Sequence, residues 1–382
     1  MISHPRKIRI QFDPVQDALP NGGRPSKGIS AAAAVADTLW LGHDEGVSVE
    51  RLCAERTKTG SIRYAKHRCF DLRKLIALPA PGGNVGAPTP EVDLEGIAFA
   101  DDYLWITGSH SAARGEPAGR SVSDAIAALA DVERSGNRFL LACIPVKPGA
   151  EGPALVRRWR TADGRVLRAA RLPGGRKNDA LTRALSGDPH LGPFLSIPSK
   201  DNGFDIEGLA AAPGGRLFLG LRGPVLDGWA CVLEIMVGAH PDRDGELTLR
   251  KLPGLAAPGR PPVRYRKHFL DLEGAGVRDL SFAGRDLLVL TGPPMRGKGR
   301  SQIRLWKNAL ASRHESMRQQ KDLPKLLELP YREKKDHAEG IAIVGQRGNR
   351  VTLMVFYDSA SKDRRLPPAA MWATVHALAL PR

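Results

Sequence analysis

The phrase Glu-Gly-Ile-Ala or Glu-Gly-Leu-Ala occurs three times in this 382-residue sequence, beginning at Glu95-Gly96, Glu207-Gly208 and Glu339-Gly340. Two further copies of the phrase carry a basic residue instead, in Lys27-Gly28 and Arg278-Asp279. Each phrase leads through a turn into a second apolar run, so each charged residue is expected to begin an inner strand. Carboxylates that point at one shared axis repel one another unless a cation compensates them. We therefore take these five charged residues as a candidate ring around a channel.

Three arrangements could stabilise the charged side chains of a ring made of Lys27, Glu95, Glu207, Arg278 and Glu339. In the first, Glu95, Glu207 and Glu339 bind Ca²⁺, because hard cations prefer carboxylate oxygen ligands. In the second, Lys27 and Arg278 form salt bridges with the glutamates and no metal is needed. In the third, the glutamates accept hydrogen bonds from backbone amides of the next repeat. The sequence names Ca²⁺ as a candidate cofactor and requires none.

A second group of polar residues follows the second strand of each copy, and its chemistry differs from copy to copy. Such diversity at equivalent positions is typical of a site grafted onto a repeated scaffold. The candidates for acid–base or catalytic work are His43, His110, Arg222 and Tyr357. The candidates for ligand binding are Ser109, His110, Arg222 and Asp358. Arg222 is the strongest of these, because a guanidinium can grip a carboxylate or phosphate with two parallel hydrogen bonds. The alternative is that Ser109 caps a turn and Arg222 pairs with Asp227 on the surface.

Positioning these residues requires a repeated unit of strands. The second residues of the five phrases lie 68, 112, 71 and 61 positions apart along the chain. A strand-and-turn unit that recurs at such intervals predicts an all-β fold, a β-propeller. We expect one domain over residues 1–382, with five blades at approximately 28–92, 93–204, 205–272, 273–336 and 337–382. Six blades are the alternative, because the 112-residue interval has room for another.

The last copy lacks an outer strand, and the alternating segment at residues 7–12 is predicted to supply it. This pairing would close the ring and remove an exposed sheet edge. Within the second blade, Ser121–Arg134 and Asp179–Leu185 have the spacing and capping residues of short helices. We expect both as helical insertions, the first of them roofing the face that carries the second group.

Composition and net charge indicate which classes of partner and which cellular location to expect. The formal net charge of +16 favours an anionic small molecule, an acidic protein partner or nucleic acid. Nucleic acid is not favoured, because only 5% of the residues are aromatic and stacking side chains are scarce. No apolar run approaches the roughly 18 residues of a membrane span, so no membrane is expected. The four cysteines are scattered singly, which is typical of reduced thiols and predicts a cytoplasmic protein.

The phrases at Asp93–Ala98, Asp205–Ala210 and His337–Ala342 resemble a bacterial family known only as domain of unknown function 3616. The resemblance extends from about residue 28 onward, and the name of the family implies no activity. More distantly, the Glu-Gly phrase resembles that of phytase-like and esterase-like β-propellers. This second resemblance implies metal-assisted hydrolysis of phosphate or carboxylic esters, with Glu95, Glu207 and Glu339 matching the phrase. Lys27 and Arg278-Asp279 depart from it.

Two functions remain from the sequence. The first is a cytoplasmic binding protein that holds an anionic small molecule or a macromolecular partner at one face of the channel. The second is a hydrolase of phosphate or carboxylic esters, with or without metal. The first is favoured, because the sequence contains no G-x-S-x-G elbow, P-loop, H-E-x-x-H or C-x-x-C motif.

Overall fold

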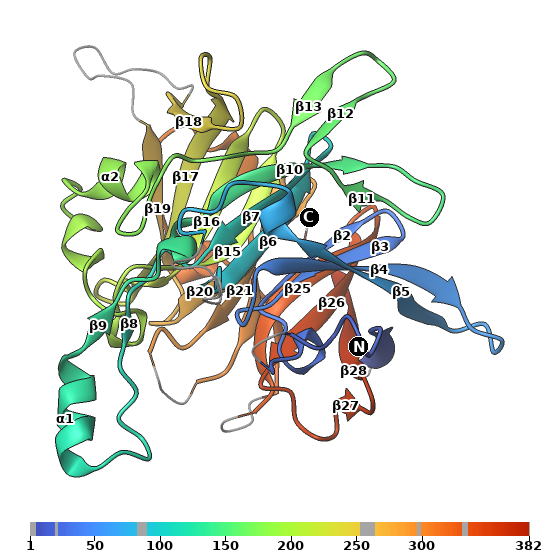
Figure 1. Ribbon diagram of the computed structural model, residues 1–382, viewed down its shortest axis with the longest axis horizontal. Helices are drawn as coiled ribbons and strands as arrows, with labels where there is room; N and C mark the ends of the chain where they lie inside the picture. The colour runs from blue at the N-terminus through green and yellow to red at the C-terminus, as the bar shows by residue number, and fades with distance from the viewer. Residues whose placement is uncertain are drawn as a thin grey trace.

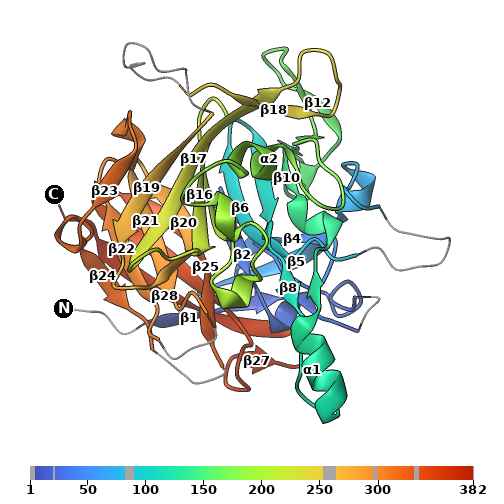
Figure 2. The same cartoon turned by 90° about the vertical axis from the view of Figure 1, so that its left-hand side faces the viewer.

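The computed structural model describes residues 5–19, 22–81, 90–252, 264–295, 299–330 and 335–381. They form an all-β, propeller-like molecule whose antiparallel sheets are arranged around a shared centre (Figures 1 and 2). Within these residues α-helix is confined to α1 (Val122–Ala130) and α2 (Ala180–Leu185). No helix in the described part of the chain is long and apolar enough to cross a membrane.

The first and last sheets are joined edge to edge through the N-terminal strand. The first sheet is a meander of β2 (Ala31–Val35), β3 (Thr38–Gly42), β4 (Ser48–Arg56) and β5 (Ile62–Asp71). The last contains β25 (His337–Arg347), β26 (Arg350–Asp358), β28 (Ala370–Ala379) and the short β27 (Arg365–Leu366). β1 (Arg6–Gln11) pairs antiparallel with β28 and touches β5 in parallel at Ile10 opposite Tyr64. The N-terminal strand therefore lies beside the last repeat, where its alternating pattern places it.

Three further sheets complete the circuit. One contains β6 (Leu94–Ala100), β7 (Tyr103–Gly108), β10 (Leu141–Lys147), β11 (Ala154–Leu155) and β14 (Ala170–Arg171). The next contains β15 (Asp205–Ala212), β16 (Arg216–Gly223), β17 (Trp229–Ala239), β18 (Leu247–Arg250), β19 (Tyr265–Asp271) and β23 (Ser316–Arg318). The third contains β20 (Gly276–Ala283), β21 (Asp286–Gly292), β22 (Gln302–Trp306) and β24 (Lys325–Glu328). Two small hairpins, β8 (Ala113–Arg114) with β9 (Val132–Glu133) and β12 (Arg158–Arg160) with β13 (Val166–Arg168), lie outside these sheets.

The innermost strands form a closed circle of neighbours. β2 contacts β6, β6 contacts β15, β15 contacts β20, β20 contacts β25, and β25 returns to β2. Apolar side chains fill the layers between adjacent sheets; Trp105, Leu209 and Leu219 pack in one layer and Trp40, Ile97 and Ile106 in the next. Close packing of this kind fixes where each inner strand begins, and with it the side chains at the channel mouth.

Both predicted helical insertions are present, in shortened form. α1 occupies the middle of the predicted Ser121–Arg134 segment, and the Ser121 side chain accepts a hydrogen bond from the Asp124 amide at its N-cap. α2 begins after Asp179, whose carboxylate caps it by accepting from the Thr182 amide. The end of the first predicted helix is instead the strand β9, which pairs with β8.

Ile10→Ala is expected to lower the free energy of unfolding by about 2–5 kcal/mol, because Ile10 is fully buried in the seam between the first and last sheets. Urea denaturation measures this loss. Ile62→Ala, in the neighbouring strand β5 but 45% exposed, is the matched control and should cost about 1 kcal/mol or less. Equal losses in the two variants would mean that β1 does not stabilise the seam.

Candidate functional site

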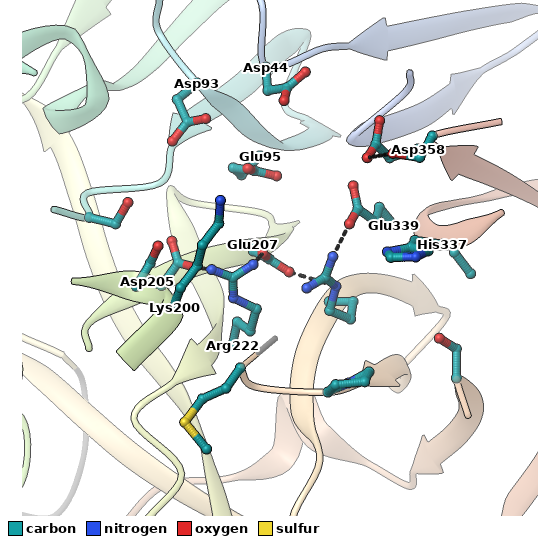
Figure 3. A pocket seen from close by; sticks show the side chains of 18 of the residues that line it. Asp44, Asp93, Glu95, Lys200, Asp205, Glu207, Arg222, His337, Glu339 and Asp358 are labelled. Carbon is teal, nitrogen blue, oxygen red and sulfur yellow. Dashed lines mark hydrogen bonds and ion pairs between the residues drawn. The ribbon is translucent and has the colours of Figure 1, made fainter. Parts of the chain in front are cut away.

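A cavity of about 910 Å³ opens at the end of the channel where the inner strands begin. Its described lining contains nine carboxylates against five lysine or arginine side chains. The carboxylates are Asp44, Glu91, Asp93, Glu95, Asp205, Glu207, Asp336, Glu339 and Asp358, and the cations are Arg114, Arg138, Lys200, Arg222 and Arg278. An acidic cavity in a chain of net charge +16 is a local inversion of the overall charge. Figure 3 shows most of these charged side chains pointing into one space.

Irregular strand pairing aims the ring residues at this cavity. On four inner strands the register with the second strand shifts by one residue at the charged position, which leaves Glu95, Glu207, Arg278 and Glu339 without a cross-strand partner. Such bulges bend a strand and redirect a side chain. β16 shifts in the same way at Arg222. Four of the five predicted ring residues therefore do meet around one channel mouth.

A ladder of alternating charges runs across three sheets. The Arg222 guanidinium contacts Asp205 at 2.6 Å and Glu207 at 2.7 Å. Arg278 contacts the other oxygen of Glu207 at 2.8 Å and reaches Glu339 on the next sheet (Figure 3). Each guanidinium thus bridges two carboxylates with one contact to each, and such charge-assisted contacts are stronger than neutral hydrogen bonds. The sequence-based salt-bridge arrangement is thus present for Glu207, Arg278 and Glu339, with Arg222 as an additional member.

Lys27 does not join this ladder. Pro25 begins the 3₁₀ turn η1 (Pro25–Lys27), and the inner strand β2 starts only at Ala31, without a register shift. Lys27 is exposed and is not among the residues that line the cavity. The first repeat contributes Asp44 instead, from the loop after β3.

The side of the cavity opposite the ladder is acidic, and Arg222 and Arg278 act on its Glu95 without forming an ion pair with it. Within the described part of the chain no ion pair reaches Glu95, Asp44 or Asp358, although Ser359 donates a hydrogen bond to Asp358. Burial, with repulsion from Asp358 and Asp93, raises the pKa of Asp44 to about 6. Burial, then repulsion from Glu207 and Asp93, raises the pKa of Glu95 well above its ordinary value. We call Asp44, Glu95 and Asp358 the uncompensated arc.

Two carboxylates of the ladder also hold protons more tightly than usual. Burial raises the pKa of Asp205 to about 7, although the adjacent Arg222 opposes the shift. Burial likewise raises the pKa of Glu339 to about 8 against the opposing effect of Arg278. Perturbed carboxyl groups in a solvent-accessible cavity are typical of functional sites.

Three of the four catalytic candidates from the sequence lie away from the cavity, buried among partners. His43 lies near Ser48 at 3.2 Å and Glu50 at 3.5 Å. His110 contacts Asp179 at 3.1 Å through Nε2. These two buried histidines contact neighbouring carboxylates and do not line the cavity.

Tyr357 and Ser109 are also structural. The Tyr357 hydroxyl lies 2.8 Å from Thr374, and Arg364 covers the ring at 3.6 Å. Ser109 donates to Asp93 at 2.5 Å and so positions a lining carboxylate without lining the cavity itself. Of the catalytic and ligand-binding candidates named from the sequence, Arg222 and Asp358 line the cavity, and Arg222 is already paired with two carboxylates. Its partners are Asp205 and Glu207, and not Asp227 on the surface.

Backbone strain gathers at the same place. Asp93, Asp336 and Ser359 line the cavity with positive φ angles of 55°, 55° and 49°. Non-glycine residues rarely adopt this left-handed conformation, and it is found disproportionately at binding and active sites. The sequence offered one signal for Asp93, its place two residues before Glu95, but none for Asp336.

Asp279 is a buried carboxylate at the position that glycine occupies in the other repeats. It accepts hydrogen bonds from the Leu280 amide and, across to the next sheet, from the Ile341 amide, both at 2.7 Å. The third arrangement considered above, a carboxylate stapling neighbouring repeats, is therefore realised by Asp279 and not by the glutamates.

A calcium site formed by Glu95, Glu207 and Glu339 gains no support. Among the described residues no group of three or more His, Cys, Asp or Glu side chains is placed so as to hold a metal ion. Glu207 and Glu339 each form an ion pair with Arg278 instead. The cavity is that of a propeller-like protein whose channel mouth carries a polarised set of charges.

The chain belongs to the family described as "Protein of unknown function (DUF3616)", which matches residues 28–374. No curated protein matches the sequence. Virginiamycin B lyase from Staphylococcus aureus is similar at 13% identity and a TM-score of 0.30, over 99% of this chain and 100% of that one. The WD40 β-propeller domain of Doa1 is similar at 10% identity and 0.30, over 93% and 94%. Likeness at this level adds nothing to the fold derived from strand pairing.

Arg222→Ala is expected to lower the free energy of unfolding by about 3–5 kcal/mol at neutral pH, because it leaves buried Asp205 without its paired cation and Glu207 with Arg278 alone. Arg165→Ala is the matched control, since Arg165 also bridges two carboxylates, Asp163 and Asp102, but is 52% exposed. The control should lose about 1 kcal/mol or less. Urea denaturation of both variants makes the comparison, and similar losses would contradict a structural role for the ladder.

Asp44→Asn is expected to stabilise the protein at pH 8 by about 2 kcal/mol, with the gain disappearing near pH 4. The folded protein keeps a proton on Asp44 up to about pH 6, whereas the unfolded chain releases it near pH 4, so stability falls between those values. The neutral amide removes this loss. Asp242→Asn, in an exposed loop, serves as the control and should change stability little at either pH. A gain that is the same at both pH values would contradict the raised pKa.

Proposed function

We propose that this protein is a ligand-binding β-propeller whose cavity accepts a small organic cation at the uncompensated arc. The observation that carries the proposal is the charge count of the lining, nine carboxylates against five lysine or arginine side chains in a chain of net charge +16. Arg222 and Arg278 neutralise one side of the cavity. A bound ammonium or guanidinium group would do the same for Asp44, Glu95 and Asp358.

An organic cation fits better than a metal ion for two reasons. The arc carboxylates are spread over a cavity of about 910 Å³, which is the size range of small-molecule sites. In addition, the described residues provide no group of three acidic, His or Cys side chains close enough to share a metal. Extended amines place separate positive charges several ångströms apart and so match separated carboxylates.

The anionic ligand expected from the net charge is less well supported. Its intended anchor, Arg222, is engaged by Asp205 and Glu207, so its charge is not available to a phosphate or carboxylate. We therefore propose a binding function, as the sequence suggests, with a cationic ligand in place of the anionic one.

We also propose five blades and a cytoplasmic location. The circle of contacts through β2, β6, β15, β20 and β25 supports five, one inner strand for each blade. All four cysteines are free, which supports a reducing compartment.

Hydrolysis of phosphate or carboxylic esters is the second candidate. It is favoured by one observation, that Asp205 and Glu339 keep protons near neutral pH within the cavity. A protonated carboxyl group beside ionised ones can act as a general acid. Turnover of generic phosphate or acetate esters that is lost in Glu339→Gln would favour this function over binding alone.

Spermidine is expected to bind wild-type protein, and Glu95→Gln to weaken that binding at least about tenfold, because a charge-assisted contact is lost. Affinity should rise with pH, because a cation must displace the proton that the raised pKa of Glu95 retains. Isothermal titration calorimetry in buffers of different ionisation enthalpy measures both affinity and proton release.

Glu151→Gln, an exposed carboxylate outside the cavity, is the control and should bind spermidine as wild type does. Calcium chloride and inorganic phosphate are the comparison ligands. Binding of phosphate without binding of spermidine would overturn the charge assignment. Calcium binding that Glu95→Gln abolishes would restore the metal hypothesis.

A further inference from the structure

The hairpin arm formed by β8, α1 and β9 carries α1 away from the sheets. In both views α1 lies at the outer edge of the molecule, beyond the body of the propeller (Figures 1 and 2). The arm is anchored at its base, where Arg114 donates to Asp201 at 2.7 Å and β8 pairs with β9. Within α1 only Ala128 is buried. The rest of the helix surface is therefore open to another molecule.

Exposed apolar side chains concentrate on this arm. Of the ten large apolar residues exposed in the described chain, four fall between residues 122 and 132. Val122, Ile126 and Leu129 are 79%, 66% and 49% exposed. Their spacing of four and three residues places them in one stripe along the helix, because neighbours at these intervals share a face. Asp124 and Asp131 project from the opposite side, about half a turn away.

This helix has little to hold it in place. Isolated helices shorter than about 12–15 residues are marginal in water, and most helical stability comes from packing an apolar face. α1 has nine residues and, with Ala128 alone buried, leaves its apolar stripe uncovered. A cover over Val122, Ile126 and Leu129 would supply the missing packing.

We propose that a second copy of this chain provides the cover, with two α1 helices packed antiparallel about a two-fold axis at Ile126. The stripe is self-complementary in that arrangement, since Val122 of one copy faces Leu129 of the other and the two Ile126 side chains meet. A two-fold contact of identical patches is the commonest form of protein self-association.

Charge complementarity selects the antiparallel pairing. Arg120 precedes the N-terminal end of α1, whereas Glu133 follows its C-terminal end. In the described residues no ion pair engages either side chain. Antiparallel packing brings the basic end of one helix to the acidic end of the other and opposes their dipoles. Parallel packing would bring like charges together.

Sedimentation of the full chain over a roughly hundredfold concentration range should show a monomer–dimer equilibrium, weak because a contact of two short helices is small. Ile126→Asp should raise the dimer dissociation constant at least about tenfold, because it places a charge at the centre of the apolar contact. Val15→Asp is the matched control: Val15 is 82% exposed but lies outside the arm, so association should persist.

A charge exchange tests the orientation. Arg120→Glu should weaken the dimer, and the double variant Arg120→Glu with Glu133→Arg should restore it. Unchanged melting temperatures would establish that all variants fold. A wild-type protein that stays monomeric throughout, or an Ile126→Asp variant that associates like wild type, would overturn the proposal. Dimerisation in which the double variant is weaker than Arg120→Glu alone would overturn the antiparallel arrangement.

Discussion

The pairing of Arg222 and Arg278 with three buried carboxylates is the interaction on which the rest of the molecule depends. These five side chains come from β15, β16, β20 and β25, so the contacts that neutralise them also hold three sheets in register. Buried charges are tolerated only when they are paired. The same requirement gives the cavity its polarity, because the cations that stabilise one side are not available to the other.

Much of this arrangement could be predicted from the sequence, because each position of the repeated phrase has a physical reason for its residue type. Glycine follows the charged residue since neighbouring inner strands approach closely there; a Cβ at Gly96 would lie 2.6 Å from that of Leu209. The charged residue before it occupies the bulge. Lys27 matched the phrase and still missed the ring, because Pro25 imposes a turn that repeat spacing does not reveal. The all-β, propeller-like fold and four of five ring residues were therefore predictable.

The rest of the candidate site could not be predicted from the sequence. His43, His110 and Tyr357 were plausible catalysts by residue type, and only three-dimensional packing reveals the carboxylate or hydroxyl that engages each one. Asp44 follows His43 in the second group, and becomes significant through the burial and the repulsion from Asp358 and Asp93 that raise its pKa. Composition misled in the same way, because a total charge of +16 says nothing about where the negative charges gather. The partners of a side chain and the places where charges gather depend on contacts between residues far apart in the sequence, whereas the patterns in a single sequence are local.

The seam between β1 and β28 has a consequence for how the chain acquires its shape during synthesis. Gln11 on β1 donates to Ala369, a residue 358 positions later. β1 leaves the ribosome long before its partner exists, while the sheets between them can assemble one after another as they emerge. Ring closure is consequently the last event and the one with the largest loop-closure entropy. Until it occurs, two strand edges remain unpaired, and the nascent protein is exposed to edge-to-edge pairing with neighbouring chains.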